Sequence, residues 1–176
     1  DIAKILSAVP GMYMRTEEGY GLRPNISIRG TAIERSGKVT IMEDGILVAP
    51  SPYTSSAAYY FPTMGRIHAV EVLKGSAAVS QGPQTIGGAI NLLSTPIPEV
   101  TSFKLNQEFG ENGMLRTHAY YGGTSGNFGG LIEIHDHASD GFDSIANVGG
   151  DTGFDKSDVV IKARYATENH SLTFKM

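Results

Sequence analysis

The residues best placed to do chemistry stand in one apolar run, where an acid and a base lie three positions apart. Glu71 and Lys74 belong to the segment AVEVLKG, residues 69–75, and glycines occur at positions 75, 82, 87 and 88. The Gly87-Gly88 pair directly precedes an apolar segment, which marks a backbone that must bend or approach another backbone closely. This pattern predicts two strands joined by a glycine-hinged loop.

Side chains typical of catalysis or metal binding do not form a complete site in this sequence. No GxSxG, phosphate-loop, HExxH or dinucleotide-binding motif is present, so we expect no catalytic residues and no enzyme. His135 and His137 lie on one face of a predicted strand, as two zinc or copper ligands would, but the sequence places no third ligand. The aspartates at 140, 143, 151 and 155 fit no calcium-binding loop. We therefore expect no metal site.

The composition favours a protein of strands and turns. The 176 residues include 22 glycines, and charged residues make up 18%, below the roughly 25% that is typical of soluble domains. A net charge of −4 gives no electrostatic footprint for nucleic acid. The absence of cysteine excludes disulfides and thiolate metal sites. The sequence contains no apolar run long enough for a transmembrane helix and no signal peptide, and it opens without Met, so we expect an excised or processed chain.

The first part of the chain, residues 1–98, has an irregular pattern. Apolar residues at helical spacing predict a helix over Ile2–Val9, which Pro10-Gly11 ends. The Asp44-Gly45 pair between apolar neighbours predicts a hairpin over Val39–Val48. The Pro96–Pro98 segment is the expected domain boundary. Short strands are expected at Ile26–Arg29, Val39–Met42, Ala69–Leu73 and Ala89–Leu93, with loops at Arg15–Pro24, Ala49–Pro62 and Ser80–Thr85.

From Thr101 the pattern changes to strict alternation of apolar and polar residues. Phe103 and Leu105, for example, alternate with Lys104 and Asn106. The alternation predicts five strands, each with one apolar and one polar face. The last strand stops in mid-pattern and five such strands cannot close, so the sequence is expected to be a piece of something larger.

Alternation alone fits a soluble sandwich as well as a membrane barrel. Two features favour the barrel. The turn at Glu111–Gly113 is short whereas the Ser139–Asp155 connection is long, and aromatic residues are expected at or near strand ends, where barrels carry aromatic girdles. These aromatic residues are Phe109, Tyr120, Tyr121, Phe128 and Tyr165.

Six short motifs follow one another through the first half of the chain. They are AVPGM (8–12), SIRG (27–30), MEDGI (42–46), AVEVLKG (69–75), GPQTIGGAIN (82–91) and STP (94–96). In these motifs and in their order, the first half resembles, over its whole length, the plug domain of TonB-dependent outer-membrane transporters. GPQ and the PSPY loop at Pro50–Tyr53 are most similar to the ferric dicitrate receptor branch. The chain departs from the family pattern at Lys74, where Arg is usual, and at Gln81, where Tyr is usual. No TonB-box pentapeptide precedes Asp1.

This resemblance implies a fold, a location and a function. Residues 1–98 would form an α+β plug domain with a small mixed sheet, and residues 99–176 the N-terminal strands of a transmembrane barrel of about 22 strands. The chain would belong to a receptor in the bacterial outer membrane that imports a ferric siderophore of the ferric citrate type and is energised by TonB. Its partners would be TonB, the ferric chelate and outer-membrane lipid, with no nucleic acid and no covalently bound cofactor.

The resemblance also implies roles for particular residues. Donors at the tips of the plug loops would hold the ligand, because Arg, Gln and Tyr groups suit the oxygen atoms of a ferric chelate. A second set would pair with charges of the barrel wall as a latch for plug movement. The expected ligand-binding residues are Arg23, Tyr53, Thr54, Ser55 and Gln84, the latch residues are Arg29, Glu71 and Lys74, and the structural glycines are Gly30, Gly45, Gly75, Gly82, Gly87 and Gly88.

Two alternatives to this function remain open at the level of the sequence. The first keeps the transporter and changes the cargo to cobalamin, haem or an oligosaccharide. The second is a soluble β-rich binding or adhesion module with no transport role. A loop residue such as Tyr53 or Gln84 can also simply pack on its loop or fix a turn, without touching a ligand.

Overall fold

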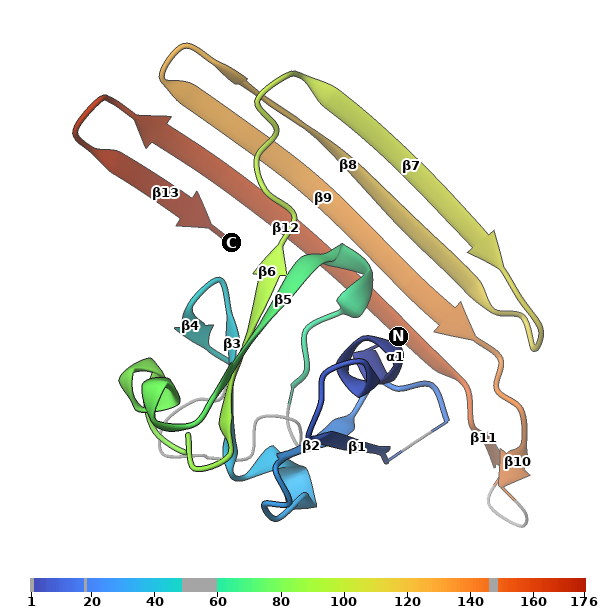
Figure 1. Ribbon diagram of the computed structural model, residues 1–176. Helices are drawn as coiled ribbons and strands as arrows, with labels where there is room; N and C mark the ends of the chain where they lie inside the picture. The colour runs from blue at the N-terminus through green and yellow to red at the C-terminus, as the bar shows by residue number, and fades with distance from the viewer. Residues whose placement is uncertain (1, 18, 49–59, 146–148) are drawn as a thin grey trace. The chain divides into compact units, whose positions relative to one another are not determined.

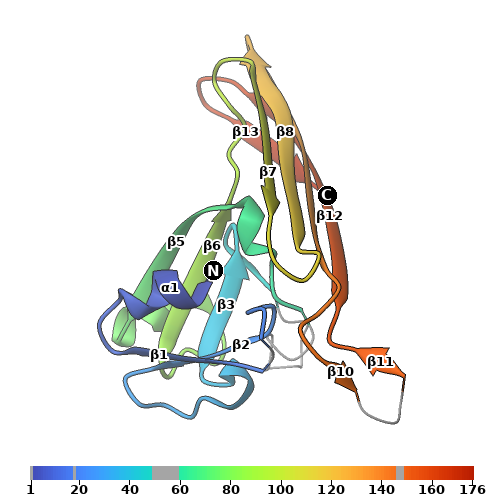
Figure 2. The same ribbon diagram turned by 90° about the vertical axis from the view of Figure 1, so that its right-hand side faces the viewer.

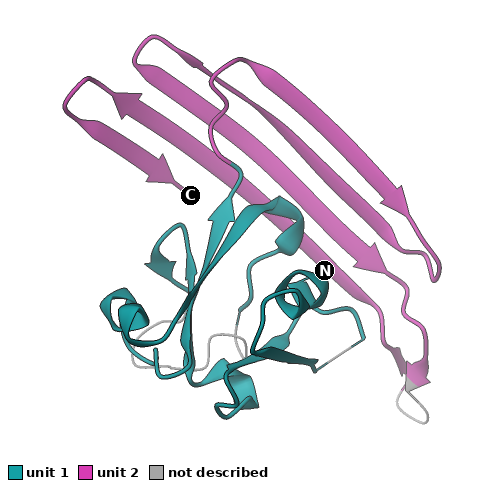
Figure 3. Ribbon diagram, viewed as in Figure 1, with its two compact units in different colours: residues 1–95 teal, residues 96–176 magenta. Residues whose placement is uncertain are grey.

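The computed structural model of the chain describes residues 2–17, 19–48, 60–145 and 149–176. The chain divides into two compact units, residues 1–95 and 96–176 (Figure 3). We call them the N-terminal unit and the C-terminal unit. The division falls beside the proline-bounded segment Pro96–Pro98.

The N-terminal unit combines one short helix with short strands, and the C-terminal unit consists of longer strands (Figure 1). In the first unit the elements are α1 (Ile2–Ser7), β1 (Met12–Thr16), β2 (Pro24–Ile28), η1 (Glu34–Ser36), β3 (Val39–Glu43), β4 (Ile46–Leu47), η2 (Met64–Arg66), β5 (Ile67–Lys74), η3 (Ser76–Gln81) and β6 (Gly88–Ser94). In the second they are β7 (Ser102–Phe109), β8 (Leu115–Ser125), β9 (Phe128–Ser139), β10 (Ser144–Ile145), β11 (Gly150–Asp151), β12 (Phe154–Ala166) and β13 (Ser171–Lys175).

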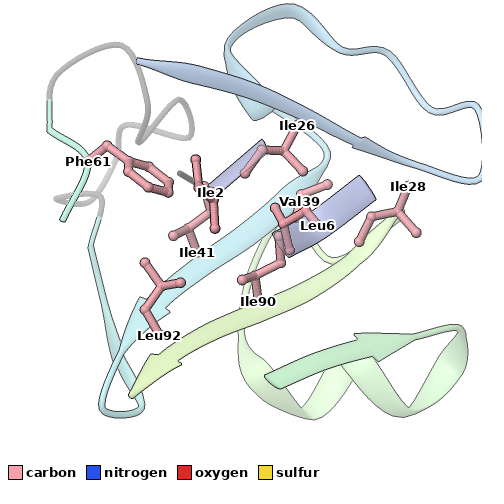
Figure 4. Close-up of a cluster of buried hydrophobic side chains, with 9 residues drawn as sticks. All are labelled: Ile2, Leu6, Ile26, Ile28, Val39, Ile41, Phe61, Ile90 and Leu92. Carbon is pink, nitrogen blue, oxygen red and sulfur yellow. The ribbon is translucent and has the colours of Figure 1, made fainter. Parts of the chain in front are cut away.

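A four-stranded mixed sheet organises the N-terminal unit (Figure 2). Its strand order is β4-β3-β6-β5, with β3 parallel to β6 and the other pairs antiparallel. Helix α1 packs on this sheet through Ile2 and Leu6, and β2 adds Ile26 and Ile28 (Figure 4). Burial of these apolar side chains is the main stabilisation of the unit. The mixed sheet that the sequence predicts is confirmed.

The hairpin predicted over Val39–Val48 is present. Strands β3 and β4 pair antiparallel, and the turn residues Asp44 and Gly45 have φ of 49° and 80°. Positive φ at both positions is what a two-residue type I′ turn requires.

Local predictions were wrong at four places in this unit. Helix α1 ends at Ser7 rather than Val9, and β2 ends at Ile28, so Arg29 lies in a turn with φ of 53°. A strand that was not predicted, β1, pairs antiparallel with β2. The loop expected over Ser80–Thr85 begins within η3. Most of the loop expected over Ala49–Pro62 lies outside the described residues.

A five-stranded antiparallel sheet forms the C-terminal unit, in the order β13-β12-β9-β8-β7. The sheet is open, with β7 and β13 as its edges. The alternation predicted from the sequence is confirmed, since apolar side chains at every second position project from one face. Those of Phe103, Leu105, Tyr121, Ile134 and Phe174 are between 42% and 68% exposed.

Two features that favoured a barrel in the sequence, the aromatic residues at strand ends and the short turn at Glu111–Gly113, lie elsewhere in the structure than predicted. Tyr120 and Tyr121 lie in the middle of β8 rather than at its end. The turn at Glu111–Gly113 and the long connection after Ser139 leave from the same end of the sheet, because successive strands run in opposite directions. The short turns that contrast with the long connection are at the other end, at residues 126–127 and 167–170.

The segment before β7 packs on the end of its own sheet. Thr124 donates a hydrogen bond to the carbonyl of Pro98 at 2.9 Å, and Arg164 reaches the Thr124 hydroxyl at 3.4 Å. A Cβ at Gly129 would lie 3.0 Å from the Ile97 side chain. The chain therefore enters β7 along a path that Thr124 and Gly129 define.

The helices within the described residues include none that is long and apolar enough to cross a membrane.

Candidate functional site

Eight of the predicted site residues lie at one end of the mixed sheet. The register pairs Val39 with Gly88 and Gly88 with Lys74, so β3 and β6 begin where β5 finishes. The connections 75–87 and 29–38 meet there, and we call this region the loop end of the sheet. The eight residues are Arg29, Gly30, Lys74, Gly75, Gly82, Gln84, Gly87 and Gly88.

The Gly87-Gly88 pair lies close to neighbouring backbone at the loop end. The backbone N–H of Gly87 donates to the carbonyl of Lys38 at 2.8 Å. A Cβ at Gly88 would collide with the carbonyl oxygen of Leu73 and lie 2.9 Å from Cδ1 of Ile28. The close backbone approach that the sequence predicts for this pair is therefore present.

The loop that carries Gln84 is fixed at several points. Gln84 is half-buried and has a φ of 64°, a left-handed conformation that costs a non-glycine residue about 1–3 kcal/mol. The buried hydroxyl of Thr40, in β3, donates a hydrogen bond to the carbonyl of Pro83. The Thr85 hydroxyl donates to the carbonyl of Gly82 at 3.3 Å. Gln84 is thus held in an unfavourable backbone conformation by its surroundings.

Two basic side chains stand where three turns of the N-terminal unit meet. Lys74 donates through Nζ to the carbonyl of Pro10 at 3.0 Å, and the backbone N–H of Arg29 donates to the carbonyl of Gly11 at 2.7 Å. A Cβ at Gly75 would lie 3.6 Å from Nη1 of Arg29. This junction of the turns at 10–11, 29–30 and 74–75 brings two positively charged side chains to the loop end of the sheet.

Glu71 does not pair with Lys74 in the described structure. The two residues are three positions apart on β5, and odd spacing puts side chains on opposite faces of a strand. The Glu71 carboxylate instead accepts a hydrogen bond from Nδ2 of Asn91 at 2.9 Å, and Oδ1 of Asn91 accepts the backbone N–H of Gly45 at 2.8 Å. Pairing of these residues with barrel charges stays a prediction.

Sequence reasoning missed a polar cluster at the other end of the mixed sheet. Arg66 is 4% exposed, its guanidinium forms a two-pronged ion pair with Glu43, and it also donates to the Tyr60 hydroxyl at 2.9 Å. Asp44 accepts hydrogen bonds from the backbone and side chain of Ser94. A signal was present in the sequence, since Glu43-Asp44 and Arg66 border predicted strands.

Of the remaining predicted ligand-binding residues, the structure describes only Arg23, which is not brought to the loop end. Arg23 precedes β2 and Arg29 follows it, so the extended strand separates them by roughly 15–20 Å. Tyr53, Thr54 and Ser55 lie outside the described residues. Joint contact of these side chains and Gln84 with one ligand stays a prediction.

The C-terminal unit carries histidines on the polar face of its sheet. The register places His118 opposite His135, with ring centroids 5.9 Å apart, and His118 contacts the Glu133 carboxylate at 2.7 Å. His118 therefore lies on the same face as His135 and His137, which the sequence alone did not show. Even so, no group of three such side chains in the described part of the chain is arranged to hold a metal ion.

The geometry of the two units defines a class of protein. A small mixed sheet with glycine-built loops precedes an open antiparallel sheet whose apolar side chains are exposed. Residues 1–89 match the family model of the TonB-dependent receptor plug domain. This chain belongs to the TonB-dependent receptor family.

Individual relatives agree with this assignment. The vitamin B12 transporter BtuB of Photobacterium profundum is 26% identical over 96% of this chain and 28% of its own length. The solved structure of the ferric citrate transporter FecA in the unliganded form is similar with a TM-score of 0.74 and 24% identity, over 97% of this chain and 27% of that one. The ferric yersiniabactin uptake receptor FyuA of Yersinia pestis has a TM-score of 0.77 and 20% identity, over 98% and 28%.

The chain spans about 28% of the length of the first of these relatives. Members of the family are transporters rather than enzymes. Family membership places this protein in the outer membrane. The N-terminal unit is a plug domain, and the open sheet is consistent with an incomplete barrel.

Proposed function

We propose that this chain is the plug and the first barrel strands of a transporter that imports a ferric chelate of the citrate type, and that it acts as a binding protein and gate rather than an enzyme. The observation that supports this choice of cargo is the set of donor groups at the loop end of the plug. There Gln84 is held at a positive φ, and the junction that bears Arg29 and Lys74 lies at the same end of the mixed sheet. Amide and cationic donors suit the carboxylate oxygens of a citrate complex, because charge-assisted hydrogen bonds are stronger than neutral ones.

The similarity to the ferric citrate transporter FecA supports this cargo. The iron is part of the cargo, so the protein needs no metal ligands of its own. Energy for import would come from TonB, and movement of the plug would open the barrel. The latch residues Arg29, Glu71 and Lys74 would exchange their present partners for charges of the barrel wall during that movement.

A second cargo is favoured by a specific finding. Two curated relatives that match are vitamin B12 transporters, each 26% identical to this chain over the matched residues. A cobalamin presents amide groups and an apolar ring rather than carboxylates. A site for it therefore needs fewer cationic donors than a site for ferric citrate.

Uptake by the full-length protein separates these cargoes. In cells that lack other importers for iron citrate and cobalamin, we expect uptake of radiolabelled ferric citrate that disappears when TonB is deleted. Uptake of radiolabelled cyanocobalamin in its place would assign the protein to the second cargo. No TonB-dependent uptake of either compound would contradict the proposed function.

Gln84→Ala tests the loop end directly. We expect the affinity for ferric citrate to fall about tenfold, which corresponds to loss of a hydrogen bond to a charged group. Gln81→Ala is the matched control, because it removes the same carboxamide from the neighbouring η3, where Gln81 contacts Ser80 at 3.2 Å. Equal effects of the two substitutions would argue against contact between Gln84 and the cargo.

The soluble-module alternative predicts different behaviour for fragments. We expect a fragment of residues 1–98 to remain soluble, whereas the 176-residue chain aggregates because its open sheet exposes an apolar face. Size-exclusion chromatography and circular dichroism of both fragments measure this difference. A monodisperse, folded 176-residue chain in water would favour the soluble module over the barrel.

A further inference from the structure

We propose that Thr40 is a positioning residue for the cargo: its buried hydroxyl fixes the Pro83–Gln84 peptide and so presents the Gln84 carboxamide. The inference rests on the proposed function, because it assigns a role at the same loop end. Thr40 is 5% exposed and lies in β3, 43 residues before Pro83, whose carbonyl accepts its hydrogen bond.

The geometry of the peptide bond explains why one hydroxyl has this effect. Proline has no N–H, so the carbonyl is its only backbone hydrogen-bonding group. The carbonyl of Pro83 and the nitrogen of Gln84 belong to one planar unit. Fixing that oxygen therefore fixes the orientation of the bond from which the Gln84 backbone continues.

The backbone of Gln84 needs such an anchor. Its φ of 64° is in the left-handed region, which is unfavourable for a residue with a side chain. Gly82, with φ of 119°, gives the preceding chain freedom to move. At the far side of the loop, Gly87 is tied to Lys38 by a backbone hydrogen bond of 2.8 Å. Thr40 thus anchors the middle of the loop to β3, and the Gly87 hydrogen bond fixes the loop again beyond Gln84.

Strand β3 is a suitable base for this anchor. It lies inside the mixed sheet between β4 and β6, and Thr40 pairs in register with Ala89 of β6. A side chain on such a strand is held more firmly than one on a loop. The contact therefore transmits the rigidity of the sheet to Gln84.

Thr40→Val tests the proposal in the full-length protein. Valine has nearly the same shape as threonine, with a methyl group in place of the hydroxyl, and Pro83 is exposed, so water can satisfy its carbonyl. We expect amide hydrogen exchange within residues 84–88 to become about tenfold faster, and the affinity for ferric citrate to fall about tenfold, equivalent to about 1.4 kcal/mol. Thr40→Ser keeps the hydroxyl, and we expect its exchange rates in residues 84–88 and its affinity for ferric citrate to match those of the wild type.

Ser36→Ala is the matched control. The Ser36 hydroxyl is also buried, but it accepts the backbone N–H of Ile26 at 2.9 Å and so holds β2 rather than the Gln84 loop. We expect this variant to leave exchange in residues 84–88 and ferric citrate affinity unchanged. If Ser36→Ala matched Thr40→Val in both readouts, the effect would be general loosening and the proposal would be overturned.

The two readouts also separate this proposal from the proposed function. Unchanged exchange in the loop of Thr40→Val would overturn the positioning role whatever the cargo. Faster exchange with unchanged affinity, in a protein that binds ferric citrate, would overturn it as well. If the wild-type protein binds no ferric citrate, the cargo proposal fails, and the exchange measurement alone decides whether Thr40 fixes the Gln84 loop.

Discussion

We expect Gly88→Ala to destabilise the plug domain by about 3–5 kcal/mol, the sum of backbone strain and steric overlap. Gly88 has a φ of 149°, and a Cβ there would collide with the carbonyl oxygen of Leu73 in the neighbouring strand. That oxygen belongs to the backbone of β5, so it cannot move aside as a flexible side chain can. Pulse proteolysis of the full-length protein in urea, with fragments from residues 1–95 followed, measures this loss.

Gly30→Ala is the comparison that isolates the steric part. Gly30 also has a positive φ, 76°, but a Cβ there would find nothing within 4 Å. The substitution should therefore lower the free energy of unfolding only by the backbone strain of a residue with a side chain at positive φ, about 1–2 kcal/mol. Equal losses for the two variants would show that close approach of β5 and β6 is not what requires glycine at position 88.

The Gly87-Gly88 pair illustrates what the sequence could predict. Two adjacent glycines before an apolar strand have few explanations other than a close backbone approach, and the structure contains one. The alternation after Thr101 was equally informative, because successive side chains of a strand point to opposite faces, so the polarity of each residue indicates which face it occupies. Strand β1 also carried a local signal, since Met12 and Met14 alternate with Tyr13 and Arg15, and both methionines pack against the core. The short length of that strand explains why it was missed.

Other features could not be predicted because they depend on contacts between distant residues. Thr40 and Pro83 are 43 positions apart, and no local pattern joins a threonine to a proline carbonyl. The pairing of His118 with His135 depends on the register of β8 and β9. The hydrogen bond between Glu71 and Asn91 depends in the same way on the register of β5 and β6. The residue types of a site can therefore be read from the sequence, whereas the contacts between its residues depend on how distant strands pair.

The largest charge effect is expected at the opposite end of the plug sheet, where Arg66 meets Glu43. The side chains are 5% and 12% exposed, respectively, and the guanidinium contacts both carboxylate oxygens. Arg66→Met would leave the Glu43 carboxylate largely buried without its cation. We expect this substitution to lower the free energy of unfolding of the plug by about 3–5 kcal/mol.

The double variant Arg66→Met with Glu43→Leu should be closer to the wild type than Arg66→Met alone. Replacing both members of a buried ion pair removes the desolvation cost together with the attraction, whereas removing one member leaves an uncompensated charge. Hydrogen exchange of the β6 amides in the full-length protein gives the opening free energy of each variant. The backbone carbonyl of Arg66 accepts the N–H of Thr95 at 3.2 Å, so loss of the pair should also loosen the end of the plug domain. Additive losses in the double variant would mean that solvent, rather than Arg66, compensates the Glu43 charge.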